Sequence, residues 1–210
     1  GGNSASTECA DVDNDGDIDL LTGEIVHWDV GSSSDPSELV LNTGEADVRF
    51  ERPGNEVTGL AREHAGVDWN DGIMTGSVFD FDNDGWPDLY LGASDYPGNH
   101  GLLFHQDSAA HFEAVPITLG IDHHRSHGSV VADFDHDGDL DILVGHSRAR
   151  CDAKAPDDCY ATSQVRFFEN VIGQDGYSLE LSLTGAAGTN RAAIGARVTV
   201  KAGDLTQTRD

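Results

Sequence analysis

Residues 80–88 read Asp-Phe-Asp-Asn-Asp-Gly-Trp-Pro-Asp, and the same nine-residue pattern recurs at residues 11–19 and 133–141. Positions one, three, five and nine are aspartate in every copy, and position six is glycine. So many carboxylates repel one another unless a cation lies among them. Glycine lets the backbone curl so that the odd-numbered side chains converge. Because oxygen ligands without Cys or His favour calcium over zinc or copper, the pattern predicts three calcium-binding loops.

Short apolar segments flank each loop and indicate that the loops connect strands. Ser-Val-Phe precedes the second copy at residues 77–79, and Leu-Tyr-Leu-Gly follows it at residues 89–92. A helical loop of the EF-hand type needs an acidic residue at position twelve. The three copies have Thr22, Leu91 and Val144 there instead. We therefore expect each loop to be a hairpin turn widened to hold an ion.

Alignment of the loops reveals a longer repeat. Further strand-like segments follow the hairpins at residues 39–42 and 48–51, 102–105 and 111–113, and 165–170. The loops start 69 and 53 residues apart. Four short strands per unit at such a period are typical of propeller blades. The expected fold class is all-β, a partial β-propeller of about three four-stranded blades over residues 5–60, 70–118 and 125–175. We expect a turn of helix only at Leu60–His64.

The composition is strongly acidic. The chain has 38 Asp and Glu residues against 12 Lys and Arg, a formal net charge of −26, and fourteen of the acids lie in the three loops. Three calcium ions would reduce the net charge to about −20. Such a surface repels nucleic acid and anionic membranes. No apolar stretch approaches the roughly 20 residues that span a bilayer, so we expect neither nucleic-acid binding nor membrane insertion.

The start of the chain does not decide its location. Gly-Gly-Asn-Ser at residues 1–4 lacks the basic and apolar segments of a signal peptide. The chain is therefore expected to be a mature product or a piece of a longer protein. Open Asp-rich loops usually bind calcium weakly, which suits calcium-rich surroundings. We expect an extracellular or cell-surface location.

The three cysteines have different predicted roles. Cys151 and Cys159 bracket a seven-residue insertion, and a disulfide between them would contribute about 2–3 kcal/mol. Two free thiols or a metal-binding pair are the alternatives. Cys9 aligns with Val78 and Val131, which predicts a buried, inert thiol, against the alternative of a reactive or intermolecular cysteine.

One histidine-rich segment is the only candidate for a transition-metal or catalytic site outside the acidic loops. Residues 122–127 read Asp-His-His-Arg-Ser-His, and such groups can bind a transition metal or act as acid and base. His-x-x-x-His spacing positions a metal well on a helix, whereas this segment has the pattern of a loop entering a strand. A solvated polar loop is therefore the favoured interpretation. The sequence contains no Gly-x-Ser-x-Gly, Walker-type or His-Glu-x-x-His motif, and we assign no catalytic residue.

Two parts of the chain resemble known families. Residues 77–90, from Ser77 to Tyr90, resemble the FG-GAP/VCBS repeats of integrin-α-type β-propellers. The tail, with Leu-Glu-Leu-Ser-Leu-Thr-Gly at 179–185 and Ile-Gly-Ala-Arg-Val-Thr-Val at 194–200, looks like the opening of an ASPIC/UnbV domain. The combination is similar to the cartilage acidic protein family. The resemblance implies propeller repeats over residues 1–175 and the truncated start of a small β-domain over residues 176–210.

The resemblance also implies which residues bind calcium. In the family the ligands are the side chains at positions one, three, five and nine and the carbonyl at position seven. Carried over to the three loops of this chain, the ligands are Asp11, Asp13, Asp15, Asp17 and Asp19; Asp80, Asp82, Asp84, Trp86 and Asp88; and Asp133, Asp135, Asp137, Asp139 and Asp141.

The expected function is binding. We expect a secreted protein in which structural calcium rigidifies blades that mediate adhesion to an extracellular protein or glycan, with contacts from the variable segments 30–37, 95–101 and 148–161. One alternative is a propeller-based enzyme, such as a glycan lyase or a phosphoesterase. Another is a filament or matrix subunit that self-associates through its open blade edges.

Overall fold

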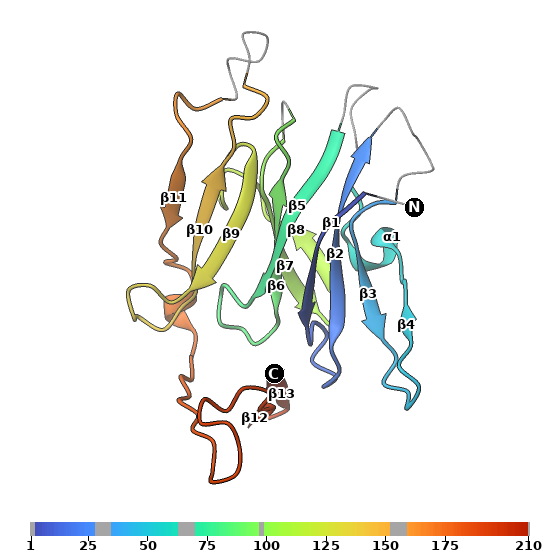
Figure 1. Ribbon diagram of the computed structural model, residues 1–210, viewed down its shortest axis with the longest axis vertical. Coiled ribbons are helices and arrows are strands. Elements are labelled where there is room, and N and C mark those ends of the chain that lie inside the picture. The colour runs from blue at the N-terminus through green and yellow to red at the C-terminus, as the bar shows by residue number, and fades with distance from the viewer. Residues whose placement is uncertain (1–2, 28–34, 63–69, 97–98, 152–158, 210) are drawn as a thin grey trace.

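The computed structural model describes residues 3–27, 35–62, 70–96, 99–151 and 159–209, and within them the protein is nearly all β (Figure 1). Blade 1 contains β1 (Asn3–Ala10), β2 (Asp19–His27), β3 (Glu38–Asn42) and β4 (Phe50–Glu51). Blade 2 contains β5 (Asn70–Phe79), β6 (Asp88–Ala93), β7 (Leu102–Ser108) and β8 (His111–Ala114). Blade 3 contains β9 (Ser126–Ala132), β10 (Asp141–His146) and β11 (Val165–Phe168).

Consecutive strands within each blade pair antiparallel, so each acidic loop closes a hairpin. The prediction of an all-β, partial propeller is confirmed. The third blade differs from the expected four strands, because its described residues form three. After β11 the chain instead makes a short 3₁₀ turn, η2 (Gly173–Asp175), and leaves the sheet.

The described residues form two hydrophobic cores between the blades. One joins blades 1 and 2 through residues such as Val12, Leu21 and Leu89, and the other joins blades 2 and 3 through residues such as Tyr90 and Ile142. Blade 2 contributes to both because successive side chains of a strand point to opposite faces. A blade in the middle therefore needs apolar residues at nearly every strand position, and all six residues of β6 are buried.

Two sequence-based predictions were wrong. The turn of helix lies at α1 (Asn55–Thr58) rather than at Leu60–His64, since Gly59 ends the helix in the left-handed conformation with φ 77° and Leu60 packs into the first core. His64 lies outside the described residues. Cys9 pairs with Leu20 as Val78 pairs with Leu89, but its thiol is exposed. The predicted strand register of Cys9 is therefore correct. Its predicted burial is wrong because, among the described residues, no blade covers this outer face of blade 1.

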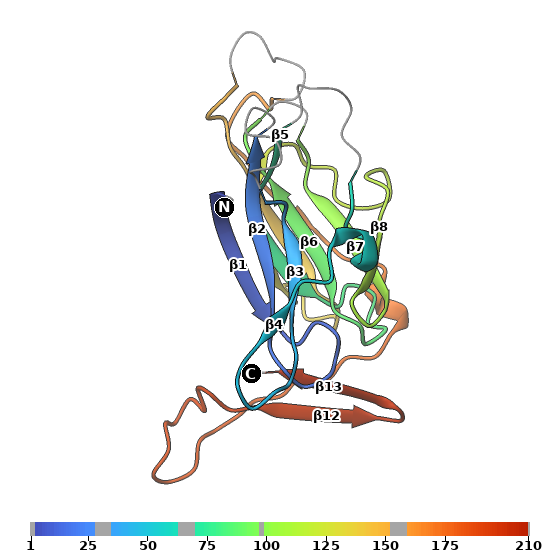
Figure 2. The same ribbon diagram turned by 90° about the vertical axis from the view of Figure 1, so that its right-hand side faces the viewer.

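The tail runs along the edge that carries the acidic loops. Its two strands, β12 (Val198–Ala202) and β13 (Leu205–Arg209), pair as a hairpin that lies across that edge (Figure 2). Gln207 donates a side-chain hydrogen bond to the Gly85 carbonyl at 2.9 Å, and Arg197 donates one to the Gly16 carbonyl at 3.0 Å. Residues 179–185, which resemble the opening of an ASPIC/UnbV domain, form no strand, and Leu179, Leu181 and Leu183 are exposed.

Candidate metal-binding loops

The three acidic loops have one backbone conformation. Position six is glycine with φ between 97° and 100° in every loop, at Gly16, Gly85 and Gly138. Position four is also left-handed, with φ of 58°, 57° and 64° at Asn14, Asn83 and His136. Residues with side chains rarely adopt positive φ, and asparagine tolerates it better than most. The repeated conformation shows that the sequence pattern encodes one specific turn.

Hydrogen bonds inside each loop fold the chain back onto its own carboxylates. In the second loop the Gly85 backbone N–H donates to Asp80 Oδ2 at 2.8 Å, and the Trp86 N–H donates to Asp84 Oδ1 at 2.8 Å. The corresponding bonds exist in the other two loops. Position three accepts the backbone N–H of position five in each loop as well. Together the bonds orient the side chains of positions one, three and five toward the centre of the turn.

Three of the four predicted carboxylates converge in each loop: positions one, three and five in the first two loops, and positions one, three and nine in the third. One oxygen from each member lies within 4.8 Å of the others in three triplets: Asp11, Asp13 and Asp15; Asp80, Asp82 and Asp84; and Asp133, Asp135 and Asp141. These groups are formed of oxygen ligands alone, which is the ligand set of a hard divalent cation.

Some of the converging oxygens are buried without a hydrogen bond. Asp11 is 3% exposed, and its Oδ1, like Oδ1 of Asp133, has no hydrogen-bond partner among the described residues. Both oxygens of Asp139, at position seven of the third loop, are in the same situation. A buried carboxylate oxygen without a partner is costly, and a bound cation would satisfy it. The first and third loops therefore contain buried oxygens that a metal ion would satisfy.

The raised pKa values of the loop carboxylates also favour a bound cation. Burial, followed by the neighbouring carboxylates Asp19 and Asp15, raises the pKa of Asp13 to about 6. Burial raises the pKa of Asp80 to about 6, although a hydrogen bond from the Gly85 N–H opposes this rise. The cause in both cases is the difficulty of keeping several buried carboxylates ionised together, and a cation removes it.

The ninth aspartates hold each loop to its blade. Asp88 Oδ2 accepts the Phe81 N–H at 2.9 Å and its Oδ1 accepts the Gln106 N–H at 2.7 Å. Asp19 and Asp141 make the equivalent pairs of bonds. All three side chains are almost completely buried. Position nine therefore connects the turn to the third strand of blades 1 and 2, and to Asn170, two residues after the third strand, in blade 3.

Side-chain amides link one blade to the next, and sequence reasoning missed them. Asn14 donates to the Gly85 carbonyl at 2.9 Å, and Asn83 donates to the Gly138 carbonyl at 3.2 Å, so position four of each loop bonds position six of the following loop. Position two is linked as well: Gln106 donates to the Val12 carbonyl at 2.9 Å. Asn170 donates to the equivalent Phe81 carbonyl at 2.6 Å. The repetition of Asn at position four was the available signal.

The predicted histidine segment lies at the opposite end of the blades from the loops. His123 is fully buried and packs its ring against His146 and Tyr160, so it faces the interior. His127 Nε2 lies 4.0 Å from Asp95 Oδ1. The structure therefore separates the three histidines of the segment. Only His124 joins a potential metal group, with Asp122 and with His100, which the sequence had not singled out.

The same end carries the disulfide and parts of the variable segments. Cys151 and Cys159 are joined, with their Cα atoms 5.7 Å apart. Parts of the three variable segments, residues 30–34, 97–98 and 152–158, lie outside the described residues.

Between blades 2 and 3, Phe81, Leu103, Ile142 and Phe168 help to line an apolar cavity of about 160 Å³.

Comparison with known proteins supports the repeat. Residues 80–144 match the model of an FG-GAP-like repeat, and this stretch contains the second and third loops. A search of curated proteins finds no match. Among the described residues no helix has the length and hydropathy of a membrane span. The fold, the loops and the match together define a repeat protein with a propeller-like fold and acidic groups that could bind metal.

Proposed function

We propose that the chain is a calcium-stabilised part of an extracellular β-propeller protein that binds a protein or glycan partner. The observation that carries the proposal is one turn repeated three times, in each of which carboxylate oxygens of three aspartates converge. In the first and third loops, buried oxygens of Asp11, Asp133 and Asp139 also lack hydrogen-bond partners. Calcium suits loops whose ligands are all oxygen, and its flexible coordination tolerates the different residue at position seven. In this proposal the ions rigidify the blades, and the opposite end presents the binding loops.

The first test measures calcium stoichiometry and its effect on stability. Calorimetric titration is expected to show three ions per chain. If each site is filled at about 100 times its dissociation constant, each ion stabilises the fold by roughly 2.7 kcal/mol, so chelation lowers the unfolding temperature markedly. Asp13→Asn, Asp82→Asn and Asp135→Asn keep an acceptor oxygen at position three but remove a charge. Each is expected to reduce the stoichiometry by one ion.

The matched control is Asp47→Asn, which removes the charge of an exposed acid outside the loops. It is expected to retain three ions and the unfolding temperature of the unmodified chain. If chelation leaves the unfolding temperature unchanged, or fewer than three ions bind, the structural role of calcium is wrong.

The binding role has a separate test. The calcium-loaded chain is immobilised and exposed to a panel of extracellular glycans and matrix proteins, and retention is measured again after chelation. Calcium-dependent retention of one partner is expected, because chelation loosens the blades that hold the binding loops. A folded, calcium-loaded chain that retains no member of the panel would contradict the adhesive role.

A second candidate function is self-association through blade 3. Strand pairing makes Phe134, Leu143 and Phe167 equivalent to two sets that are buried between blades: Val12, Leu21 and Leu39, and Phe81, Tyr90 and Leu103. In blade 3 the equivalent phenylalanines are 42% and 46% exposed. The next blade covers this set in both earlier cases. The face of blade 3 therefore suits another blade, which we propose comes from a second copy through its exposed blade 1 face.

Sedimentation velocity over a range of concentrations tests this candidate. The chain is expected to associate as its concentration rises, and Phe134→Ser together with Phe167→Ser is expected to abolish association. Tyr177→Ser is the control, because this tail residue is 97% exposed and lies off the blade. A strictly monomeric chain at every concentration would exclude self-association.

A further inference from the structure

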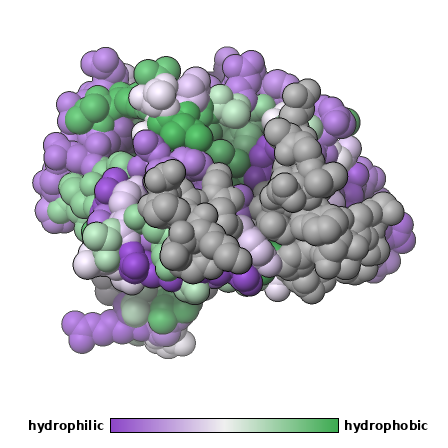
Figure 3. Space-filling view, turned by 90° about the horizontal axis from the view of Figure 1, so that it is seen from above, coloured by the Kyte–Doolittle hydropathy of each residue, from purple (hydrophilic) through white to green (hydrophobic). Residues whose placement is uncertain are grey.

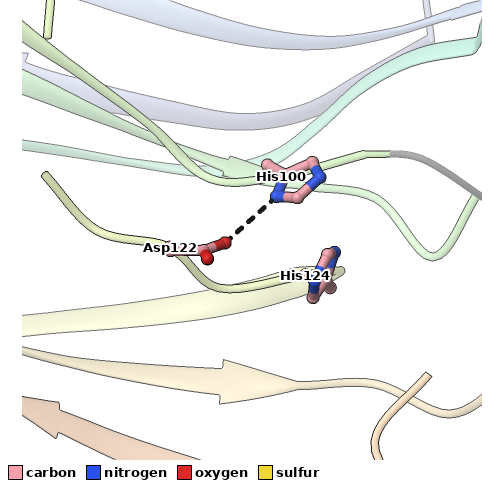
Figure 4. A group of neighbouring side chains, drawn as sticks. All are labelled: His100, Asp122 and His124. Carbon is pink, nitrogen blue, oxygen red and sulfur yellow. Dashed lines mark ion pairs between the residues drawn. The ribbon is translucent and has the colours of Figure 1, made fainter. Parts of the chain in front are cut away.

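Two histidines and an aspartate gather at the end of the molecule opposite the acidic loops. His100, Asp122 and His124 come from the β6–β7 connection and from the segment that leads into β9 (Figure 4). One ligand atom of each lies within 4.8 Å of the others. His100 Nδ1 is 3.5 Å from Asp122 Oδ1, and the ring centroids of His100 and His124 are 4.2 Å apart. We propose that these three side chains bind a divalent transition-metal ion of the zinc class.

The backbone fixes the two imidazoles side by side. His100 and His124 are directly opposite each other in an isolated antiparallel bridge. The flanking residues make its hydrogen bonds: Arg125 N–H donates to the Asn99 carbonyl at 3.0 Å, and Gly101 N–H donates to the His123 carbonyl at 3.2 Å. The histidines thus form the closer, non-hydrogen-bonded type of cross-strand pair, whose side chains project to one face.

His124 contacts His146 and Tyr160, and Asp122 contacts His100. His146 Nδ1 lies 2.7 Å from the His124 carbonyl oxygen, and the His124 ring packs edge-on against Tyr160 with centroids 5.7 Å apart. Asp122 lies two residues before His124 in the chain, and its Oδ1 is 3.5 Å from His100 Nδ1. Its carboxylate points toward His100 in Figure 4. The group is therefore arranged by the fold around it and not by chance contact of long side chains.

The chemistry of the group separates it from the acidic loops. Two imidazole nitrogens and one carboxylate oxygen suit zinc, copper or nickel, whereas calcium prefers oxygen ligands alone. The Asp122 side chain is 64% exposed, so further coordination positions face solvent, as in zinc sites that have three protein ligands and a water. Figure 3 looks onto this end, where hydrophilic and hydrophobic residues lie side by side on the surface. The proposed zinc site lies at the end of the molecule that presents the variable loops. It is therefore separate from the structural calcium sites.

The test is calorimetric titration of the full chain with Zn²⁺ in excess Ca²⁺, so that the acidic loops are already filled. One zinc ion per chain is expected. His100→Gln, His124→Gln and Asp122→Asn are each expected to weaken zinc binding by roughly tenfold or more, since each removes one of three ligands. His136→Asn is the matched control: it removes a histidine from the other end and introduces the residue that loops 1 and 2 have at this position. It is expected to leave zinc affinity unchanged.

Spectroscopy distinguishes this site from the second acidic loop, where His105 lies near Asp82 and Asp88. With Cu²⁺ as the probe in excess Ca²⁺, electron paramagnetic resonance is expected to show two nitrogen ligands. It is expected to show one in His100→Gln or His124→Gln and two in His105→Gln. The proposal is overturned if the unmodified chain binds no zinc in calcium, if the three ligand variants bind it equally well, or if only His105→Gln removes nitrogen coordination.

Discussion

Individual residues of the loops explain why the pattern recurs with so little variation. Position six needs positive φ and position four accepts it, so the turn itself selects Gly and Asn at these places. The asparagine at position four has a second role, because its side-chain amide donates a hydrogen bond to the next loop. His136 takes this position in blade 3, where it is exposed. The change from Asn to His therefore coincides with the loop that has no following loop among the described residues.

Replacing the turn glycines separates backbone strain from packing. Gly16→Ala is expected to lower the free energy of unfolding by about 1 kcal/mol, because a new Cβ at φ 97° is strained but would have only Thr208 Oγ1 nearby, at 3.9 Å. Gly85→Ala is expected to cost roughly 1–3 kcal/mol more, since its Cβ would lie 2.4 Å from Leu205 Cδ2. Chemical denaturation in excess calcium measures both. Equal losses in the two variants would show that the tail does not pack against loop 2.

Gln106 is expected to be the most sensitive polar residue of the interface between blades 1 and 2. It is fully buried, and its side chain donates to the Val12 and Pro87 carbonyls and accepts the Ala110 N–H. Gln106→Met is close in volume but leaves these groups unsatisfied, each at about 1–3 kcal/mol. The variant is therefore expected to unfold at clearly lower denaturant concentration. Gln174→Met is the control, because it loses a single hydrogen bond, to Asp137 Oδ2 at 2.9 Å, that is exposed to solvent. In excess calcium it should change stability by less than about 0.5 kcal/mol.

At the scale of elements, the sequence predicted strands and turns well and their environments less well. Periodicity identifies β6 and β10 and their loops, because both local pattern and packing favour the same structure. It did not predict that Cys9 is exposed, since burial there depends on a neighbouring blade and not on the strand. It also did not join His100 to His124, which required pairing between two loops that the chain separates by a hairpin. A local sequence pattern predicts local structure, whereas the environment of Cys9 and the pairing of His100 with His124 depend on residues that are distant in the sequence.

The tail hairpin β12–β13 is expected to depend on calcium. Gln207 and Leu205 of the hairpin contact loop 2, and Arg197, directly before β12, donates a hydrogen bond to loop 1. Loosening of the loops therefore removes the support of the hairpin. Chelation is therefore expected to accelerate tryptic cleavage at Lys201. Cleavage at Arg148, which is exposed at the opposite end, provides the internal control and should change much less. If both sites accelerate equally, chelation unfolds the chain as a whole; if neither does, the hairpin is held independently of the ions.

At the scale of the whole molecule, the charge decides how the fold responds to salt. The formal net charge of −26 is concentrated, because fourteen of the 38 acids lie in three loops along one edge. Without calcium, the carboxylates within each loop repel one another, since oxygens of three of them lie within 4.8 Å. Added salt screens this repulsion and the longer-range repulsion between loops, with a screening length of about 10 Å at 0.1 M. Monovalent salt is therefore expected to raise the unfolding temperature of the chelated chain.

With calcium bound, the same salt series is expected to have a smaller effect, because the ions neutralise the charges that lie closest together. Thermal unfolding between 0.05 and 0.5 M NaCl (roughly a threefold change in screening length), with excess calcium or chelator, measures both slopes. Potassium chloride provides the control for a specific effect of sodium. A salt dependence that calcium leaves unchanged would mean that the repulsion limiting stability lies in the remaining acidic surface, and that the ions act by fixing the geometry of the turns and not by cancelling their charge.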